Sequence, residues 1–226
     1  MKSKENNEKI IKGKLKLIST EERFKKIFIN NSNLENLTFL LSRLLKISYD
    51  DLLGKIELLE TPLSNTNLGE IQLKREVLVS FTETFENILL EVIIKKDFYE
   101  QNVIKFKGDY QDDFIEKKIF KEIDYSFSFK FSKELLFENL VFEEFFYRNE
   151  KGDILTKKYK SLTINLNKCY SLWLNVDYQQ QFLEYDKDLI LISALLKTVL
   201  SDEYLCILSS INMPIELKNS IKDLYE

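Results

Sequence analysis

The stretch from Lys74 to Tyr99 constrains the fold more than any other part of the chain. It contains KREVLVSF, TETFEN and ILLEVIIKKDFY, which predict two strands, a short turn and the start of a helix. Two-residue alternation places Leu90, Val92 and Ile94 on the strand face that packs toward helices. Glu91 falls on the opposite face. The stretch therefore predicts a β-hairpin leading into a helix, within a fold that mixes both element types.

Other segments of the chain carry helix or strand patterns of their own. The strongest is Ile123–Phe131, where apolar and polar residues alternate strictly, which predicts a half-buried strand. Helices are expected from Thr20, where Thr20 would be the cap, from Leu34 to about Lys46, at Ser48–Leu52, from Asp97 to about Lys107, from Asp186 to about Leu200, at Ser201–Ile211 and from Pro214. Further strands are expected at Lys14–Ile18, Lys55–Thr61, Leu140–Tyr147 and Ile154–Asn167, and Cys169–Leu174 is expected to be extended.

These elements predict an α+β fold with a mixed central sheet, flanking helices and a C-terminal helical cap. We divide the chain into residues 1–19, a basic tail or edge strand, 20–185, the α/β core, and 186–226, a C-terminal helical segment. The helix from Asp186 to Leu200 is apolar nearly all round. It is expected to be either a central core helix or the face of a homodimer.

Composition excludes several kinds of chemistry. The chain has no histidine, which removes imidazole metal sites and histidine-dependent nucleophile systems. Its two cysteines, Cys169 and Cys206, form no CxxC motif, so neither a zinc site nor a disulfide framework is expected. The net charge of −4 provides no global basic field for nucleic acid. No apolar run approaches the length of a membrane span, and we expect a cytoplasmic protein.

Two carboxylates of the hairpin are candidate metal ligands. Glu76 is expected to open the first strand and Glu91 lies in the second, so both could face one cleft and hold Mg²⁺. Lys95 or Lys74 would then be the cationic helper of a nuclease. The alternative is that both acids lie on a solvated strand face. A basic run, Lys157–Lys160, could likewise contact phosphate or simply be a solvated strand end.

Six short motifs of the chain follow one another in an order that is also found in a known protein family. They are TEERFKKIF, KIELLETPLSNTNLGE, KREVLVS, ILLEV, DFYEQNVIK and KYKSLTINLN. In this order the chain resembles the Rpn/transposase-associated branch of the PD-(D/E)xK nuclease superfamily over roughly residues 20–167. The resemblance implies a PD-(D/E)xK nuclease-like fold and a protein of a mobile element, such as a phage, prophage or transposon.

The resemblance also assigns residues. It places the family's aspartate at Glu76, its glutamate at Glu91 and its lysine or glutamine at Ile93, while Tyr99 and Asn102 match the start of the following helix. An isoleucine cannot orient water or stabilise the developing phosphorane charge, so the resemblance implies a degenerate active site.

Three functions follow as expectations. The first is a catalytically degenerate protein that binds a protein or nucleic-acid partner of the host, including the version in which it inhibits a host nuclease or an RNA-guided (CRISPR) defence complex. The second is an active Mg²⁺-dependent DNA endonuclease that uses Glu76, Glu91 and Lys95 or Lys74. The third is an oligomer assembled through the helix from Asp186 to Leu200.

Overall fold

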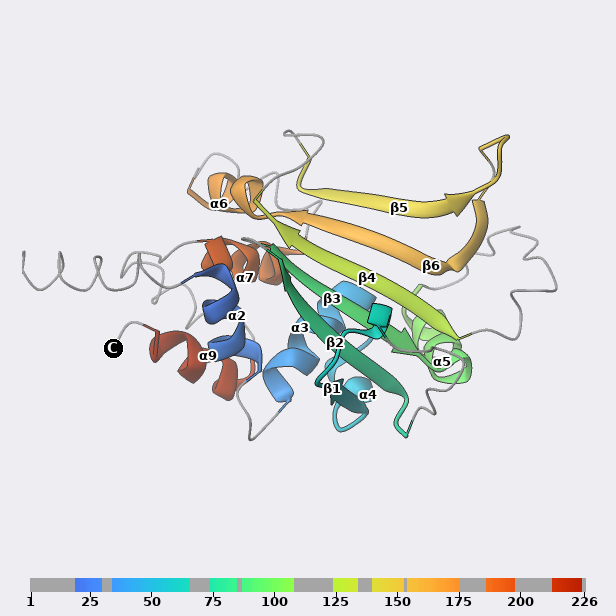
Figure 1. Cartoon of the computed structure of the whole chain (residues 1–226). Helices are drawn as coiled ribbons and strands as arrows, with labels where there is room; N and C mark the ends of the chain where they lie inside the picture. The colour runs from blue at the N-terminus through green and yellow to red at the C-terminus, as the bar shows by residue number, and fades with distance from the viewer. Residues whose placement is uncertain are drawn as a thin grey trace, which may run out of the picture.

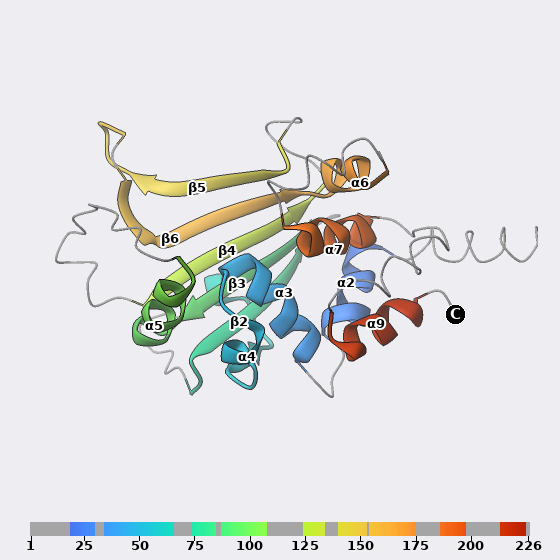
Figure 2. The ribbon, with the colours of Figure 1, turned by 180° about the vertical axis from the view of Figure 1, so that it is seen from behind.

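The structure is a computed structural model in which a six-stranded mixed sheet carries its helices mainly on one side (Figures 1 and 2). The α+β fold class predicted from the sequence is confirmed, including the mixed sheet, the flanking helices and a C-terminal helix. The structure describes residues 19–29, 34–65, 74–84, 87–107, 124–133, 140–152, 154–174, 186–197 and 213–224.

The strands lie in the order β1-β2-β3-β4-β6-β5. Two neighbouring pairs, β1 with β2 and β4 with β6, are parallel, and the other pairs are antiparallel. The strand bounds are β1 Ile56–Leu59, β2 Val77–Thr84, β3 Asn87–Ile94, β4 Tyr125–Ser132, β5 Phe142–Arg148 and β6 Ile154–Asn165. The predicted hairpin is thus β2 and β3, and the strictly alternating stretch is β4.

Helices α2, α3 and α5 pack against one face of the sheet, and α7 and α9 pack on α2 and α3 (Figure 2). The helix bounds are α2 Thr20–Phe28, α3 Glu35–Leu45, α4 Tyr49–Leu52, α5 Lys96–Lys107, α6 Leu166–Leu174, α7 Lys187–Lys197 and α9 Ile215–Lys222, with a short 3-10 turn, η1, at Leu63–Asn65. We call the sheet surface opposite these helices the open face.

The core forms where the alternating strands meet the helical layer. In β3 every second side chain from Ile88 to Ile94 is buried, and in β4 the same holds for Phe127, Phe129 and Phe131. Val92 lies opposite Phe127 and Leu90 lies opposite Phe129. Each of these two aliphatic side chains of β3 therefore has an aromatic neighbour on β4, on the same face of the sheet. The alternation seen in the sequence is therefore the cause of the two-sided sheet.

Helix α7 is a core helix. Its side chains from Leu189 to Leu196 are all buried, against α6, α2 and α3. The Arg23 guanidinium of α2 donates a hydrogen bond to the Leu196 carbonyl at 3.0 Å, which fixes the two helices together. Within its described residues, the helix leaves no apolar face exposed for a homodimer, so the core alternative holds for this segment.

Some local predictions were wrong. Ser19, not Thr20, caps α2, because its Oγ accepts the Glu22 N–H at 3.1 Å. The segment expected to be extended at Cys169–Leu174 belongs to α6, where Leu166, Cys169 and Leu172 are buried at helical spacing. Strand β2 begins at Val77, one residue after Glu76.

Other expectations fall outside the described residues. These are the strand at Lys14–Ile18, the part of the Asp186 helix beyond Lys197 and the helix at Ser201–Ile211.

Candidate functional site

The hairpin register places the two candidate acids at different positions along the sheet. Glu76 lies opposite Lys95, whose N–H donates to the Glu76 carbonyl oxygen at 2.9 Å. Glu91 lies opposite Ser80, four positions further along the strand. At about 3.3 Å per strand residue, this offset is roughly 13 Å. Both carboxylates therefore lie on the open face of the sheet, but they have different neighbours.

Glu76 lines an open cavity of about 750 Å³ at the end of the hairpin. Its Oε1 atom lies 3.6 Å from the Lys55 Nζ atom, in a side-chain ion pair. The cavity is rich in both acids and cations, since its other lining residues are Asp51, Lys95, Lys96, Asp97, Phe98, Gln101, Asn102 and Asp124. Of the predicted site residues, the structure brings Glu76 and Lys95 together at this cavity, whereas Lys74 is exposed.

Glu91 lies in a row of hydroxyl-bearing residues. Its Oε2 atom accepts a 3.4 Å hydrogen bond from Ser80 Oγ. Ser80 is fully buried, and its Oγ also accepts the Leu63 N–H at 3.0 Å, which holds η1 on the open face beside β2. On the other side of Glu91 the register continues through Ser128 of β4 and Ser161 of β6. We call Ser80, Glu91, Ser128 and Ser161 the serine row.

Ile93 lies on the open face one row from Glu91, between Leu78 of β2 and Ser126 of β4. In the described parts of the chain, no group of three or more His, Cys, Asp or Glu side chains is placed to hold a metal ion. Magnesium binding by Glu76 and Glu91 stays a prediction.

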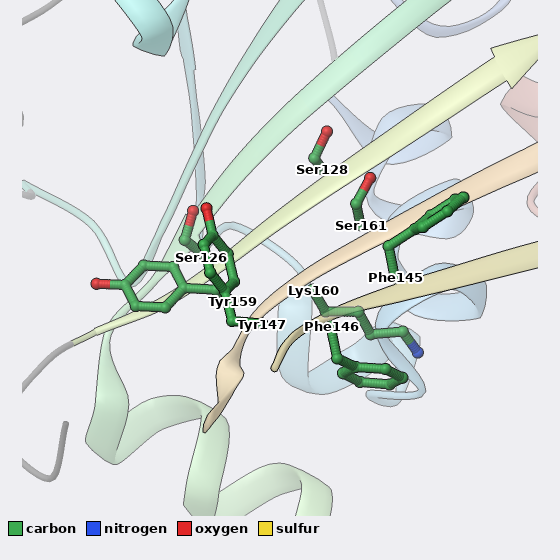
Figure 3. Close-up of a pocket in the computed structure, with 8 residues that line it drawn as sticks. All are labelled: Ser126, Ser128, Phe145, Phe146, Tyr147, Tyr159, Lys160 and Ser161. Atoms are coloured by element: carbon green, nitrogen blue, oxygen red, sulfur yellow. The ribbon is translucent and has the colours of Figure 1, made fainter. Parts of the chain in front are cut away.

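A second cavity, of about 360 Å³, adjoins the serine row where β4, β6 and β5 meet (Figure 3). Its walls combine aromatic rings with serine hydroxyls, and Tyr147 and Tyr159 contact each other edge to face, with ring centroids 5.5 Å apart. The lining residues are Ser126, Ser128, Phe145, Phe146, Tyr147, Tyr159, Lys160 and Ser161. We call this cavity the aromatic pocket.

Two side chains of the aromatic pocket are strongly exposed. Phe145 is 43% and Tyr147 is 64% exposed, whereas the three phenylalanines of β4 on the helix side of the sheet are buried. Lys160 forms an ion pair with Glu144, and its side chain points away from Ser161 and Phe145 (Figure 3). Aromatic groups beside small hydroxyls favour a ligand surface that is uncharged and offers hydrogen-bonding groups.

Within the basic run Lys157–Lys160, the Lys158 side chain fits neither alternative, a phosphate contact or a solvated strand end. Lys158 is only 1% exposed, and its ammonium lies 4.9 Å from the centroid of the Tyr125 ring, a cation–π contact. Tyr125 in turn donates to a Glu100 carboxylate oxygen at 3.2 Å. The alternation of the strand, which turns Lys158 and Lys160 to the helix side, explains the difference.

Three further candidates have structural roles. The Tyr99 ring packs on Tyr125, with centroids 4.2 Å apart, and burial raises the pKa of Tyr99 to about 12. Asn102 donates to the Phe98 carbonyl within α5 at 2.8 Å. Burial raises the pKa of the Cys169 thiol to about 12, so it is protonated at neutral pH and unsuited to nucleophilic chemistry.

Sequence reasoning missed the aromatic pocket and the serine row. The stretch YSFSFKFS contained part of the site: its phenylalanines predict a buried strand face, and its serines lie on the opposite face. The sequence does not reveal the register between strands, which aligns Ser128 with Glu91 and Ser161.

Comparison with protein-family models, curated proteins and solved structures gives no significant match to this chain. Among the helices that the structure describes, none has the length and apolar character needed to cross a bilayer.

Proposed function

We propose that the protein acts by binding a protein or nucleic-acid partner and not by cutting nucleic acid. The observation that carries this proposal is the hairpin register. It separates Glu76 from Glu91 by four positions and leaves Ile93 on the open face beside Glu91. The backbones of the two glutamates are offset by roughly 13 Å along the strand direction, which disfavours joint ligation of one Mg²⁺, whose oxygen ligands lie at about 2.0–2.1 Å.

The aromatic pocket supports binding through the open face. Its volume of about 360 Å³ falls in the range of specific ligand sites, which is roughly 300–1,000 Å³. Tyrosine and phenylalanine are enriched at protein interfaces, and serine beside tyrosine provides adaptable hydrogen bonds. The Lys160 side chain pairs with Glu144 and points away from Ser128 and Ser161, so it is not placed to contact a phosphate beside these serines (Figure 3). These features favour a protein partner over a nucleic-acid backbone.

The charge of the chain suits one version of this proposal. With a net charge of −4, the protein could compete for the basic channel in which a host nuclease, or an RNA-guided defence complex, holds its nucleic acid. In this version the aromatic pocket would contact a protein surface beside that channel. In this proposal the chain has a scaffold like that of the PD-(D/E)xK nucleases. Ile93, in place of the lysine or glutamine of that family, would explain why the chain does not cleave nucleic acid.

The first experiment tests cleavage. Supercoiled plasmid DNA and single-stranded RNA are incubated with the parent chain and with Glu91→Gln, in Mg²⁺ and in Mn²⁺. We expect no cutting by either protein. Metal-dependent cutting by the folded parent would overturn the proposal, and the Glu91→Gln result would then show whether Glu91 takes part.

The second experiment tests binding. A benzophenone amino acid replaces Ser128 in the aromatic pocket, and in a control it replaces Ile215, which is 66% exposed on α9. We expect photo-crosslinking of one host protein from position 128 only. That protein is then purified and titrated against the parent and Tyr159→Ala, and at least tenfold weaker binding by the variant is expected. Equal binding by the two would refute the role of the pocket.

An active endonuclease is the second candidate, because Glu76, Lys55 and Lys95 do lie around one cavity. This candidate predicts that Glu76→Gln abolishes cutting, whereas Glu91→Gln leaves it intact. The same cleavage assay therefore distinguishes a site centred on Glu76 from one that needs both acids.

A further inference from the structure

Strand β5 forms an outer edge of the sheet. It stands last in the strand order, and among the described strands it pairs with β6 alone (Figure 1). The opposite edge, β1, has 4 residues, whereas β5 has 7. An edge strand of this length with exposed aromatic side chains is a template for pairing with another strand. Phe145 and Tyr147 are both strongly exposed there.

The hydrogen-bond pattern shows which backbone groups of β5 point outward. Asn165 N–H donates to the Val141 carbonyl at 2.9 Å, just before the β5–β6 ladder, in which Phe142 pairs with Ile164. In an antiparallel pair, hydrogen-bonded and non-hydrogen-bonded positions alternate. Up to Phe146, residues with the parity of Val141 therefore bond to β6. Beyond Phe146 the ladder shifts register, because β6 carries additional residues between the partners of Phe146, Tyr147 and Arg148. Glu144 and Phe146 have the other parity, so their N–H and carbonyl groups point away from β6.

We propose that two copies of the chain form a symmetric dimer by antiparallel pairing of their β5 strands, with Phe146 opposite Phe146 of the second copy. In this register Phe146 exchanges both of its outward hydrogen bonds with its equivalent. The two-fold axis passes between these residues and runs perpendicular to the sheet. The sheet then continues from one copy into the other, as in strand-addition complexes.

Charge selects this register over its neighbours. With the axis at Phe146, Glu144 lies opposite Arg148 of the second copy, and the pair occurs twice by symmetry. An axis at Glu144 would place like charges opposite each other, which is destabilising. An axis at Phe145 would place Glu144 opposite Phe146 and would leave the carboxylate without a cation across the seam. One Arg148 nitrogen already donates to the Gly152 carbonyl at 2.6 Å, and a guanidinium has further donors for the carboxylate.

The same register joins the aromatic side chains. Phe145 and Tyr147 share the open face by strand alternation, and Phe145 of one copy lies opposite Tyr147 of the other. These are non-hydrogen-bonded positions, where Cα atoms approach to about 4.5 Å and side-chain contact is closest. Both residues also line the aromatic pocket. The dimer therefore places two aromatic pockets side by side on the same side of the sheet, one on each side of the seam.

Sedimentation velocity and light scattering over a range of protein concentrations measure the assembly. We expect a species of twice the 26.9 kDa chain mass. Arg148→Glu places a carboxylate opposite Glu144 in both symmetric pairs. At about 0.7 kcal/mol for each pair, the dissociation constant should rise about tenfold. Arg148→Lys keeps the opposite charge across the seam and should retain the parent value.

A disulfide tests the register directly. Cα atoms at a hydrogen-bonded antiparallel pair are about 5.5 Å apart, within the range that a disulfide spans. Phe146→Cys should therefore give a covalent dimer on mild oxidation, whereas Glu144→Cys, which is not opposite itself, should not. A chain that stays monomeric at about 100 µM would overturn the proposal. So would a dimer that Glu144→Cys crosslinks and Phe146→Cys does not.

Discussion

Replacing Tyr99 with phenylalanine should make the protein more resistant to alkali. The Tyr99 ring lies between α5 and β4, with centroids 4.2 Å from Tyr125 and 5.2 Å from Phe127. Burial raises the pKa of its phenol from 10.0 to about 12. The variant keeps the ring and its packing but removes the ionisable group.

The magnitude follows from the two pKa values. The folded pKa is raised, so the stability contributed by the neutral phenol is fully present below pH 10 and is lost as the pH rises through about 12. A difference of about two units corresponds to roughly 2.7 kcal/mol at high pH. At about pH 11.5, where the unfolded phenol is ionised and the folded one is not, about 2 kcal/mol is already lost.

Urea unfolding at about pH 8 and at about pH 11.5, with the parent, Tyr99→Phe and Tyr147→Phe, measures the effect. The free energy of unfolding of Tyr99→Phe relative to the parent should rise by about 2 kcal/mol between the two conditions. Tyr147→Phe controls for the loss of a phenol, because its side chain is 64% exposed. A rise below about 0.5 kcal/mol for Tyr99→Phe, or an equal rise in both variants, would refute the burial argument.

Three further predictions concern other parts of the chain. Cys169, whose pKa burial raises to about 12, should react with a thiol reagent at neutral pH only after unfolding, which native and urea-denatured labelling compare. Gly152 has φ +85° in the β5–β6 turn, so Gly152→Ala should lower the unfolding free energy by about 1 kcal/mol in urea titrations. Burial raises the pKa of Asp188 above 3.8 against the opposing effect of Arg43, and the resulting stability is lost as pH rises through the folded pKa. Asp188→Asn should therefore gain stability relative to the parent between about pH 4 and pH 7, and a constant difference would contradict this.

Much of the fold was readable from local patterns. Apolar residues at every second position predicted the strands β3 and β4, and apolar residues three and four positions apart predicted the helix α3. Helix α6 was missed because its buried positions, such as Cys169 and Leu172, follow directly after a long strand. Asn165 ends that strand, and its Oδ1 accepts the Lys168 N–H at 2.9 Å as a helix cap, a signal too short to outweigh the preceding β pattern.

The candidate site was less readable than the fold. Glu76 and Glu91 could be placed on one face by strand parity, but their offset depends on how the turn sets the register. The aromatic pocket depends on contacts among three strands, and its residues Ser126 and Tyr159 lie far apart in the chain. Such a site has no contiguous motif. Only the lateral alignment of the sheet creates it.

The helical layer also determines when the chain can fold during synthesis. Arg23 of α2 bonds to the Leu196 carbonyl, and Asn36 of α3 donates to Ser220 Oγ of α9 at 3.0 Å. Both α2 and α3 bury apolar side chains against helices that the ribosome produces much later. Until α7 and α9 emerge, the nascent chain carries the first helices with an uncovered apolar surface, which binds chaperones or aggregates. The core is therefore completed only after α7 and α9 have left the ribosome, and a chain that stops before α7 should be degraded or retained by chaperones.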